Sequence, residues 1–162
     1  MLLNTFLHIP YVGEITEKKL WKNNIKSWDD FLSSNVDITN KELIRKYVLL
    51  SKEKYRERDH EFFSKKLLYR YHWRAYPDFK DRCCFLDIET TGLDKKSNDI
   101  TVIGLFDGKD SKVFVNGKNI DEFSSEIEKY SYIVTFNGAC FDLPFLKEKF
   151  PEINFSQFHV DL

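Results

Sequence analysis

Two acidic residues lie close together in the stretch Phe85–Leu93, "FLDIETTGL", directly after an apolar run that begins at Cys83. Asp87 and Glu89 are two positions apart, and alternate residues of a strand point to the same face of a sheet. Like charges placed side by side repel each other and cost stability. Mg²⁺ and Mn²⁺ prefer carboxylate oxygens and would remove this repulsion. The pair is therefore a candidate metal site, and an ordinary exposed strand end is the alternative.

A third acidic residue, Asp142, follows a second apolar run, Tyr132–Phe136, at the start of a predicted helix Phe141–Phe150. In open α/β sheets, ligands bind beyond the carboxyl ends of parallel strands. If the two apolar runs are parallel neighbours, all three carboxylates converge on one edge of the sheet. Two divalent ions about 4 Å apart can stabilise the attacking and leaving oxygens of a phosphoryl displacement. The alternative for Asp142 alone is an acid that complements the helix dipole.

The elements that must position these residues form a predicted mixed sheet in residues 83–162. Short apolar runs separated by turn residues such as Asn116-Gly117 predict strands, and apolar spacing of three to four residues predicts helices. The expected order is β-β-β-α-β-α-β, a meander followed by crossover units, with helices packed on the sheet. The strands are Cys83–Ile88, Ile100–Phe106, Lys112–Val115, Tyr132–Phe136 and Phe158–Val160, and the helices are Ile120–Tyr130 and Phe141–Phe150.

Residues 1–82 are predicted to be a separate helical region. Ser27 is a suitable N-cap, and a long basic helix is expected from Thr39 or Asn40 to Tyr71, with a break near residues 58–60. Pro77 is expected to close this region, and residues 76–82 to connect it to the second half. This half holds 17 Lys+Arg and 12 Asp+Glu, whereas residues 83–162 hold 8 and 14. Opposite charges in the two halves indicate anion binding upstream and cation binding downstream. Two solvated surfaces that merely differ are the alternative.

Composition narrows the class of protein. The chain has 162 residues, of which 42% are hydrophobic and 16% aromatic, so it can bury a core and disorder is not expected. No apolar run approaches the roughly 18 residues that span a bilayer, and the N-terminus lacks the features of a signal peptide. Three cysteines without a C-x-x-C spacing favour reduced thiols. We therefore expect a cytoplasmic protein that is not bound to a membrane.

The stretch "FLDIETTGL", followed by "IVTFNGACFDLPFL" at residues 133–146, resembles the first two motifs of the DEDD, or DnaQ-like, 3′–5′ exonucleases of the ribonuclease-H-like fold. The chain looks closest to the YprB-type ribonuclease-H-like family. The resemblance implies that Asp87, Glu89 and Asp142 are catalytic and bind two Mg²⁺ or Mn²⁺ ions. It also implies a single-stranded nucleic acid or a nucleic-acid 3′ end as partner, and a substrate site lined by Thr90, Thr91, Leu93, Asn137 and Phe141.

The third motif of that family, a later helix with a fourth Asp and a nearby Tyr or His, is not present in this sequence. His159 and Asp161 lie on the last predicted strand, and their H-x-D spacing differs from that motif, so we do not transfer the role of the base to His159. Asp161 as a fourth metal ligand stays open. Three hypotheses follow: an exonuclease, a catalytically silent nucleic-acid-binding module, or a subunit whose missing C-terminal helix comes from a protein partner.

The basic half carries two candidate phosphate-binding features. The stretch Phe6–Gly13 followed by a helix resembles a helix-hairpin-helix element, in which backbone N–H groups of a hairpin ending at Gly13 would bind a phosphate. Basic residues among aromatic ones can neutralise phosphates and stack on bases. For each feature the alternative is ordinary helix packing. The best candidates for a basic strip are Lys65, Lys66, Arg70 and Arg74.

Overall fold

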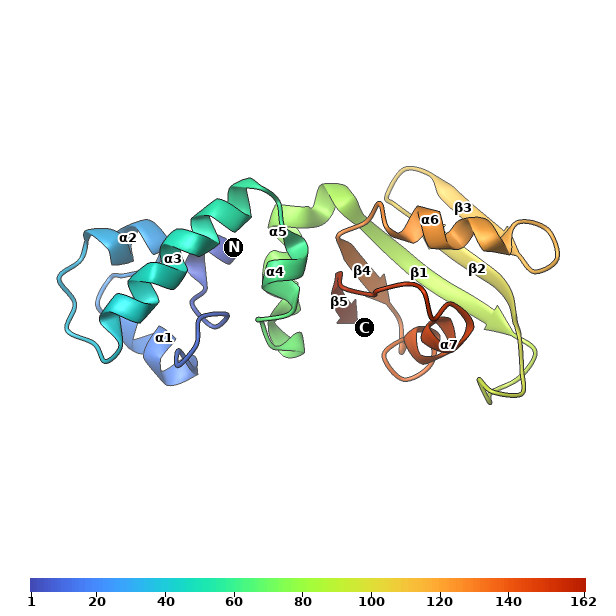
Figure 1. Cartoon of the computed structure of the whole chain (residues 1–162), viewed down its shortest axis with the longest axis horizontal. Coiled ribbons are helices and arrows are strands. Elements are labelled where there is room, and N and C mark those ends of the chain that lie inside the picture. The colour runs from blue at the N-terminus through green and yellow to red at the C-terminus, as the bar shows by residue number, and fades with distance from the viewer. The chain divides into compact units, whose positions relative to one another are not determined.

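The computed structural model describes residues 1–162 and divides into two compact units, Met1–Asp78 and Phe79–Leu162. We call them the N-terminal and the C-terminal unit. The first consists of helices and turns, and the second is a sheet with two α-helices (Figure 1). The helices of the N-terminal unit and the segment that leaves it are α1 Glu14–Lys22, α2 Trp28–Ser33, α3 Lys41–Arg56, α4 His60–Ser64, a 3-10 helix Tyr69–Ala75 and α5 Tyr76–Phe79.

The long basic helix expected to reach Tyr71 is shorter. After α3, the helix α4 ends at Ser64, and Tyr71 lies in the 3-10 helix. The side chain of His72 explains this end, because its Nε2 atom lies 3.1 Å from the carbonyl oxygen of Ser64 and 3.0 Å from that of Leu67. These carbonyl groups lie at and just after the end of α4, where they have no N–H partner within the helix. The break expected near residues 58–60 lies between the end of α3 at Arg56 and the start of α4 at His60. Pro77 lies in α5, where a proline fits the first turn of a helix.

A buried histidine lies at the centre of the N-terminal unit. His8 is 2% exposed and packs against the rings of Trp28 and Phe63. The hydroxyl of Ser51 donates to the carbonyl of Tyr47 at 2.7 Å, so it accepts from His8 Nε2 at 2.8 Å. The other ring nitrogen, Nδ1, has no hydrogen-bond partner. Burial, and secondarily the charge of Lys66, lower the pKa of His8 to about 3.

We expect the N-terminal unit to lose stability in acid because of His8. Its pKa is lowered in the fold, so the unfolded chain takes up a proton as the pH falls below 6.5 and the native chain does not until about pH 3. The free energy of unfolding should therefore fall by about 1.4 kcal/mol per pH unit across this window. Urea titrations at several pH values, followed by tryptophan fluorescence, measure this slope. In His8→Leu the slope should become shallower, and an unchanged slope would contradict the assignment.

The C-terminal unit is a five-stranded mixed sheet, as the sequence predicted, and its strands lie in the order β3-β2-β1-β4-β5. β1 is antiparallel to β2, which is antiparallel to β3, whereas β1, β4 and β5 run parallel. Two helices, α6 and α7, cover one face of this sheet (Figure 1). The elements are β1 Cys83–Thr90, β2 Ile100–Phe106, β3 Ser111–Val115, α6 Phe123–Ile127, β4 Tyr132–Thr135, α7 Asp142–Lys149 and β5 Phe158–Asp161, with a 3-10 turn Ile120–Glu122 before α6.

Strand β1 alternates between the two faces of the sheet. Cys84, Leu86 and Ile88 are buried in the core formed with α6 and α7. The residues between them are exposed on the opposite face, and they include Asp87 and Glu89. The two carboxylates therefore share one face, as their spacing predicts.

No helix of the chain is both long and apolar enough to cross a membrane. All three cysteines are free thiols, of which Cys83 and Cys84 are buried and Cys140 is exposed.

Candidate active site

The side chain of Asp142 is bound to strand β1. The strand pairs with β4 only over Cys83–Phe85, so its later backbone N–H groups on that side have no strand partner. The N–H of Ile88 donates instead to Asp142 Oδ1 at 3.1 Å. Because Ile88 lies between Asp87 and Glu89, this bond brings the carboxylate of Asp142 to the part of β1 that carries the other two acids.

Burial and neighbouring charge act together on Asp142. The residue is 3% exposed, and desolvation raises the pKa of its carboxyl group to about 6. The negative charges of Asp87 and Asp161 add to this rise, and hydrogen bonds from the backbone N–H groups of Asp142 and Ile88 offset part of it. The site therefore disfavours the ionised carboxylate of Asp142 relative to its neutral form. A cation bound nearby would favour the ionised form.

We tested the site against the chemistry of a divalent ion. No three His, Cys, Asp or Glu side chains are gathered in an arrangement that would hold a metal ion by themselves. Mg²⁺, however, is commonly held by one or two carboxylates together with waters and substrate phosphates. Asp87 and Asp142 supply two such carboxylates of the right donor type, and burial together with the charge of Asp87 raises the pKa of Asp142. The donor set fits a hard cation completed by substrate.

The predicted substrate residues are placed in different ways. The hydroxyl of Thr90 donates to the carbonyl of Gly92 at 2.8 Å, and that of Thr91 accepts from the N–H of Asp99 at 2.9 Å. Both threonines therefore hold the loop that follows β1. In contrast, Leu93 is 86% exposed and lines a shallow groove of about 410 Å³ together with Phe141.

The segment between β4 and α7, residues 136–141, carries the predicted substrate residue Asn137. This residue has a positive φ of 57°, a conformation that asparagine tolerates better than most residues, and it is exposed. Its backbone N–H donates to the carbonyl of Leu162 at 3.3 Å. The segment is thus tied to the end of β5 just before it enters α7.

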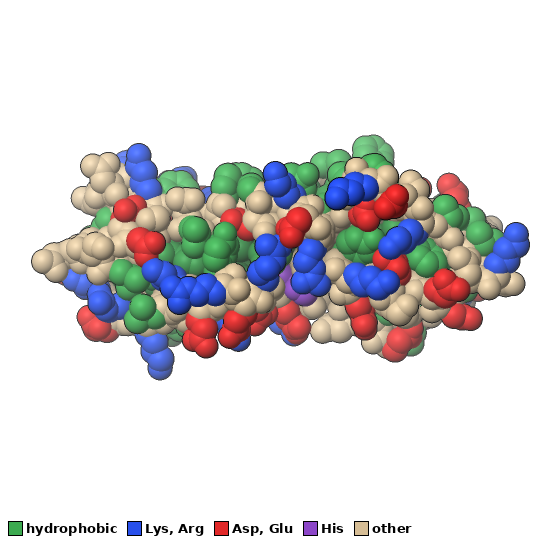
Figure 2. Space-filling model, turned by 90° about the horizontal axis from the view of Figure 1, so that it is seen from above, with side chains coloured by type: hydrophobic (Ala, Val, Ile, Leu, Met, Phe, Trp, Pro, Cys, Tyr) green, Lys and Arg blue, Asp and Glu red, His purple; other side chains and the backbone are tan.

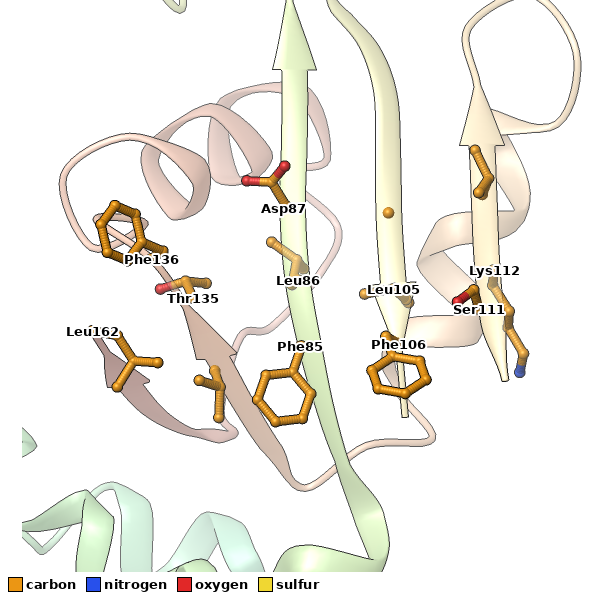
Figure 3. A pocket seen from close by; sticks show the side chains of 13 residues that line it. Phe85, Leu86, Asp87, Leu105, Phe106, Ser111, Lys112, Thr135, Phe136 and Leu162 are labelled. Atoms are coloured by element: carbon orange, nitrogen blue, oxygen red, sulfur yellow. The ribbon is translucent and has the colours of Figure 1, made fainter. Parts of the chain in front are cut away.

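The face of the sheet that carries Asp87 also holds an apolar groove of about 470 Å³ (Figure 3). Exposed aromatic rings of β1 and β2, Phe85 and Phe106, lie beside each other in it, with ring centroids 6.2 Å apart. Phe136 and Leu162, the residues that directly follow β4 and β5, border the same groove. The candidate site therefore lies at one end of an uncovered apolar surface.

The predicted basic strip of the N-terminal unit separates into buried and exposed members. Arg74 forms an ion pair with the buried carboxylate of Glu17 at 2.8 Å, and its side chain is only 13% exposed. Arg70 is exposed and pairs with Glu14, and Lys65 pairs with Glu61. On the face seen in Figure 2, Lys and Arg side chains lie close to Asp and Glu side chains.

Two further candidates in that unit are Lys66 and Gly13. Lys66 lies over the ring of Phe62, with its Nζ atom 5.2 Å from the centroid. Gly13 is the N-cap of α1 in an extended conformation, and the positive φ of this hairpin is at Tyr11.

Sequence reasoning missed two residues that shape the site, Thr135 and Gly138. Thr135 is the last residue of β4, and Gly138 lies in the segment that follows it. Both donate a hydrogen bond to the carboxylate of Asp161. Their residue types are common in strands and turns, so nothing local distinguishes them. The only available signal was their position between a predicted strand end and an acidic helix start.

Comparison with known proteins adds a family and a fold. Residues 84–162 match the family model of the RNase H superfamily. Among solved structures, the family B DNA polymerase from the hyperthermophilic archaeon Pyrobaculum calidifontis is similar over 44% of this chain, with 22% sequence identity and a TM-score of 0.33. That match covers 11% of the polymerase chain. No curated protein sequence matches this chain significantly.

Proposed function

We propose that the chain is a metal-dependent nuclease that acts at nucleic-acid 3′ ends, from the premise that residues 84–162 match the RNase H superfamily and fold as a mixed α/β sheet. The hydrogen bond from Ile88 to Asp142 is the observation that carries the proposal. It joins the second acidic motif to the first, although the two are more than 50 residues apart in sequence. The cytoplasmic location expected from the reduced cysteines is part of the same proposal.

In this proposal the acids of β1 and α7 bind the divalent ions. Asp87 and Asp142 contribute carboxylate oxygens, and Glu89 adds a third from the same face of β1 as Asp87. Mg²⁺ or Mn²⁺ bound there would supply positive charge to the phosphoryl oxygens of a phosphodiester. The groove between Leu93 and Phe141 would accept the terminal nucleotide, because its exposed apolar side chains offer a surface for a base.

The N-terminal unit would contribute binding of the nucleic-acid backbone. Arg70 and Lys65 are exposed, and their ion pairs with Glu14 and Glu61 lie on the surface. Such pairs are weak, so a phosphate can replace the carboxylate in each. Lys66 and the hairpin that ends at Gly13 belong to the same proposed surface. Because Arg74 is engaged with Glu17, we propose that it supports this surface and does not bind phosphates itself.

The proposal is tested with the full chain, a 5′-labelled single strand of DNA or RNA, and Mn²⁺. We expect a ladder of products shortened from the 3′ end, which disappears when the metal is chelated. Asp87→Ala should lower the rate by about three orders of magnitude, since loss of a ligand removes several kcal/mol of transition-state stabilisation. Glu128→Ala, which removes an exposed carboxylate from the same unit, is the matched control and should retain the wild-type rate.

A catalytically silent nucleic-acid-binding module is the second candidate. It is favoured by one observation, the lack of three metal-ligating side chains gathered in one place. Absence of Mn²⁺-dependent products, with salt-sensitive binding of the labelled strand retained, would replace the nuclease proposal with this one. The same experiment tests the subunit hypothesis, in which a partner's helix with a fourth acid packs on the sheet face beside Asp87. Activity would then appear only when that partner is added.

A further inference from the structure

The carboxylate of Asp161, the last residue of β5, binds the segment between β4 and α7. Its Oδ1 atom accepts from the N–H of Gly138 at 2.7 Å, and its Oδ2 atom accepts from the N–H of Ala139 at 3.2 Å. Oδ1 also accepts from the hydroxyl of Thr135 at 2.6 Å. Both oxygens of Asp161 therefore accept hydrogen bonds within the protein, and bonds to a charged acceptor are stronger than neutral ones.

Thr135 links this carboxylate to a buried histidine. Thr135 and Asp161 are paired residues of the parallel strands β4 and β5. Because the threonine hydroxyl donates its hydrogen to Asp161, its oxygen accepts from His159 Nε2, which lies 2.7 Å away. Thr135 and His159 are 2% and 7% exposed, so this chain of hydrogen bonds is shielded from water. Such shielding makes the arrangement rigid.

Gly138 is the point at which the segment touches β4. A Cβ atom at this position would lie 2.4 Å from Cβ of Thr135 and 2.6 Å from its hydroxyl oxygen. Only glycine allows the backbone to approach so closely. The close contact places the N–H of Gly138 within reach of Asp161, so the glycine and the acid act together.

The same glycine connects Asp161 to the start of α7. The carbonyl oxygen of Gly138 accepts from the N–H of Leu143 at 2.9 Å, in the first turn of the helix. Asp142 is the residue before Leu143 and reaches across to Ile88. A continuous path of hydrogen bonds therefore runs from β5 through Gly138 to the helix turn that carries the candidate metal ligand.

We propose that Asp161 is a positioning residue that places Asp142 by holding the segment between β4 and α7, and that it is not itself a metal ligand. The part of this inference that concerns metal rests on the proposed function, whereas the placement of Asp142 can be tested without metal. The three hydrogen bonds fill both acceptor sites of Oδ1 and one of Oδ2, so a ligand role would have to use the one remaining site on Oδ2.

Amide hydrogen exchange of the metal-free protein tests the placement. In Asp161→Ala the amides of Gly138 and Ala139 should exchange faster, and so should that of Ile88, which depends on the bond to Asp142. The amide of Ile103, in the core strand β2, should keep its protection and so exclude global unfolding. If Ile88 exchanges at the wild-type rate in Asp161→Ala, Asp161 does not place Asp142 and the inference is wrong.

Titration calorimetry with Mn²⁺ separates the positioning role from a ligand role. Thr135→Val removes the hydroxyl but leaves the Asp161 carboxylate in place. If Asp161 acts through the segment, this variant should weaken Mn²⁺ binding by about tenfold or more, as loss of outer-shell partners does. Thr135→Ser, which keeps the hydroxyl, should stay within about threefold of the wild type. Loss of Mn²⁺ affinity in Asp161→Ala while the amide of Ile88 keeps its wild-type exchange rate would make Asp161 a ligand.

The two experiments also distinguish failure of this inference from failure of the proposed function. A wild-type chain that binds no Mn²⁺ would overturn the metal site. Faster exchange at Ile88 in Asp161→Ala would even then support the placement of Asp142 by Asp161.

Discussion

Asp142→Asn is expected to abolish Mn²⁺ binding and nucleotide release while making the C-terminal unit more stable. The amide oxygen that replaces the carboxylate oxygen can still accept from the N–H of Ile88, so the helix start should keep its place. It lacks the negative charge that a divalent ion requires. We expect the rate of Mn²⁺-dependent release to fall by about three orders of magnitude.

The gain in stability follows from the sign of the pKa shift. Burial raises the pKa of Asp142 from 3.8 to about 6, so the native protein binds this proton more tightly than the unfolded chain does. The resulting stability is present below about pH 4 and is lost as the pH rises through 6. At pH 7 the charged carboxylate is therefore destabilising. Discounted for solvent screening, asparagine should recover about 1 to 2 kcal/mol.

Scanning calorimetry of the metal-free protein at pH 7 and pH 4 measures this effect. The unfolding temperature of the C-terminal unit should rise in Asp142→Asn at pH 7, by about 4 to 8 °C per kcal/mol, and much less at pH 4. Asp121→Asn, a change of the same type at an exposed position, should leave the temperature nearly unchanged. Lower stability at pH 7 would show that the carboxylate of Asp142 serves the fold and not a charge-binding function.

Arg74→Ala should destabilise the N-terminal unit by about 3 kcal/mol or more, whereas Arg70→Ala should change its stability by less than about 1 kcal/mol. Glu17 is 2% exposed and binds the hydroxyl of Thr5, the N–H of Phe6 and the guanidinium of Arg74. Removing the arginine leaves a buried charge without its cation, which typically costs 3 to 5 kcal/mol. The pair of Arg70 and Glu14 is exposed to water, where such pairs contribute little.

Urea denaturation followed by tryptophan fluorescence measures both variants. Trp21, Trp28 and Trp73 are the three tryptophans of the chain, and all lie in the N-terminal unit, so the signal reports on that unit alone. Arg74→Lys keeps the charge but loses the planar guanidinium, and should fall between the wild type and Arg74→Ala. Equal small losses in Arg74→Ala and Arg70→Ala would contradict a structural role for Arg74.

These two arginines show what a sequence pattern can and cannot distinguish. They are four positions apart in the same basic and aromatic stretch, and both were candidates for binding phosphates. Only the fold shows that Arg74 forms an ion pair with the buried Glu17, which lies more than 50 residues upstream. A local pattern records the charge of a side chain but not the distant partner that neutralises it.

The fold of the C-terminal unit was predictable because its signals are local. Alternating burial in β1 and the shared face of Asp87 and Glu89 both follow from the period of a strand. Element ends were less predictable. β4 stops at Thr135 and not at Phe136, and α6 covers only Phe123–Ile127, because tertiary contacts decide where a regular element ends.

The sequence by itself determined that this protein has a helical, basic first half and a mixed sheet with acidic residues at its strand ends. It did so because residue type and spacing act over a few positions of the chain. Only the tertiary structure decided that Asp142 accepts a hydrogen bond from the N–H of Ile88. It also decided that both carboxylate oxygens of Asp161 accept hydrogen bonds from the segment between β4 and α7. Those partners are set by where β4 ends and how closely Gly138 approaches Thr135, which are properties of packing between distant segments.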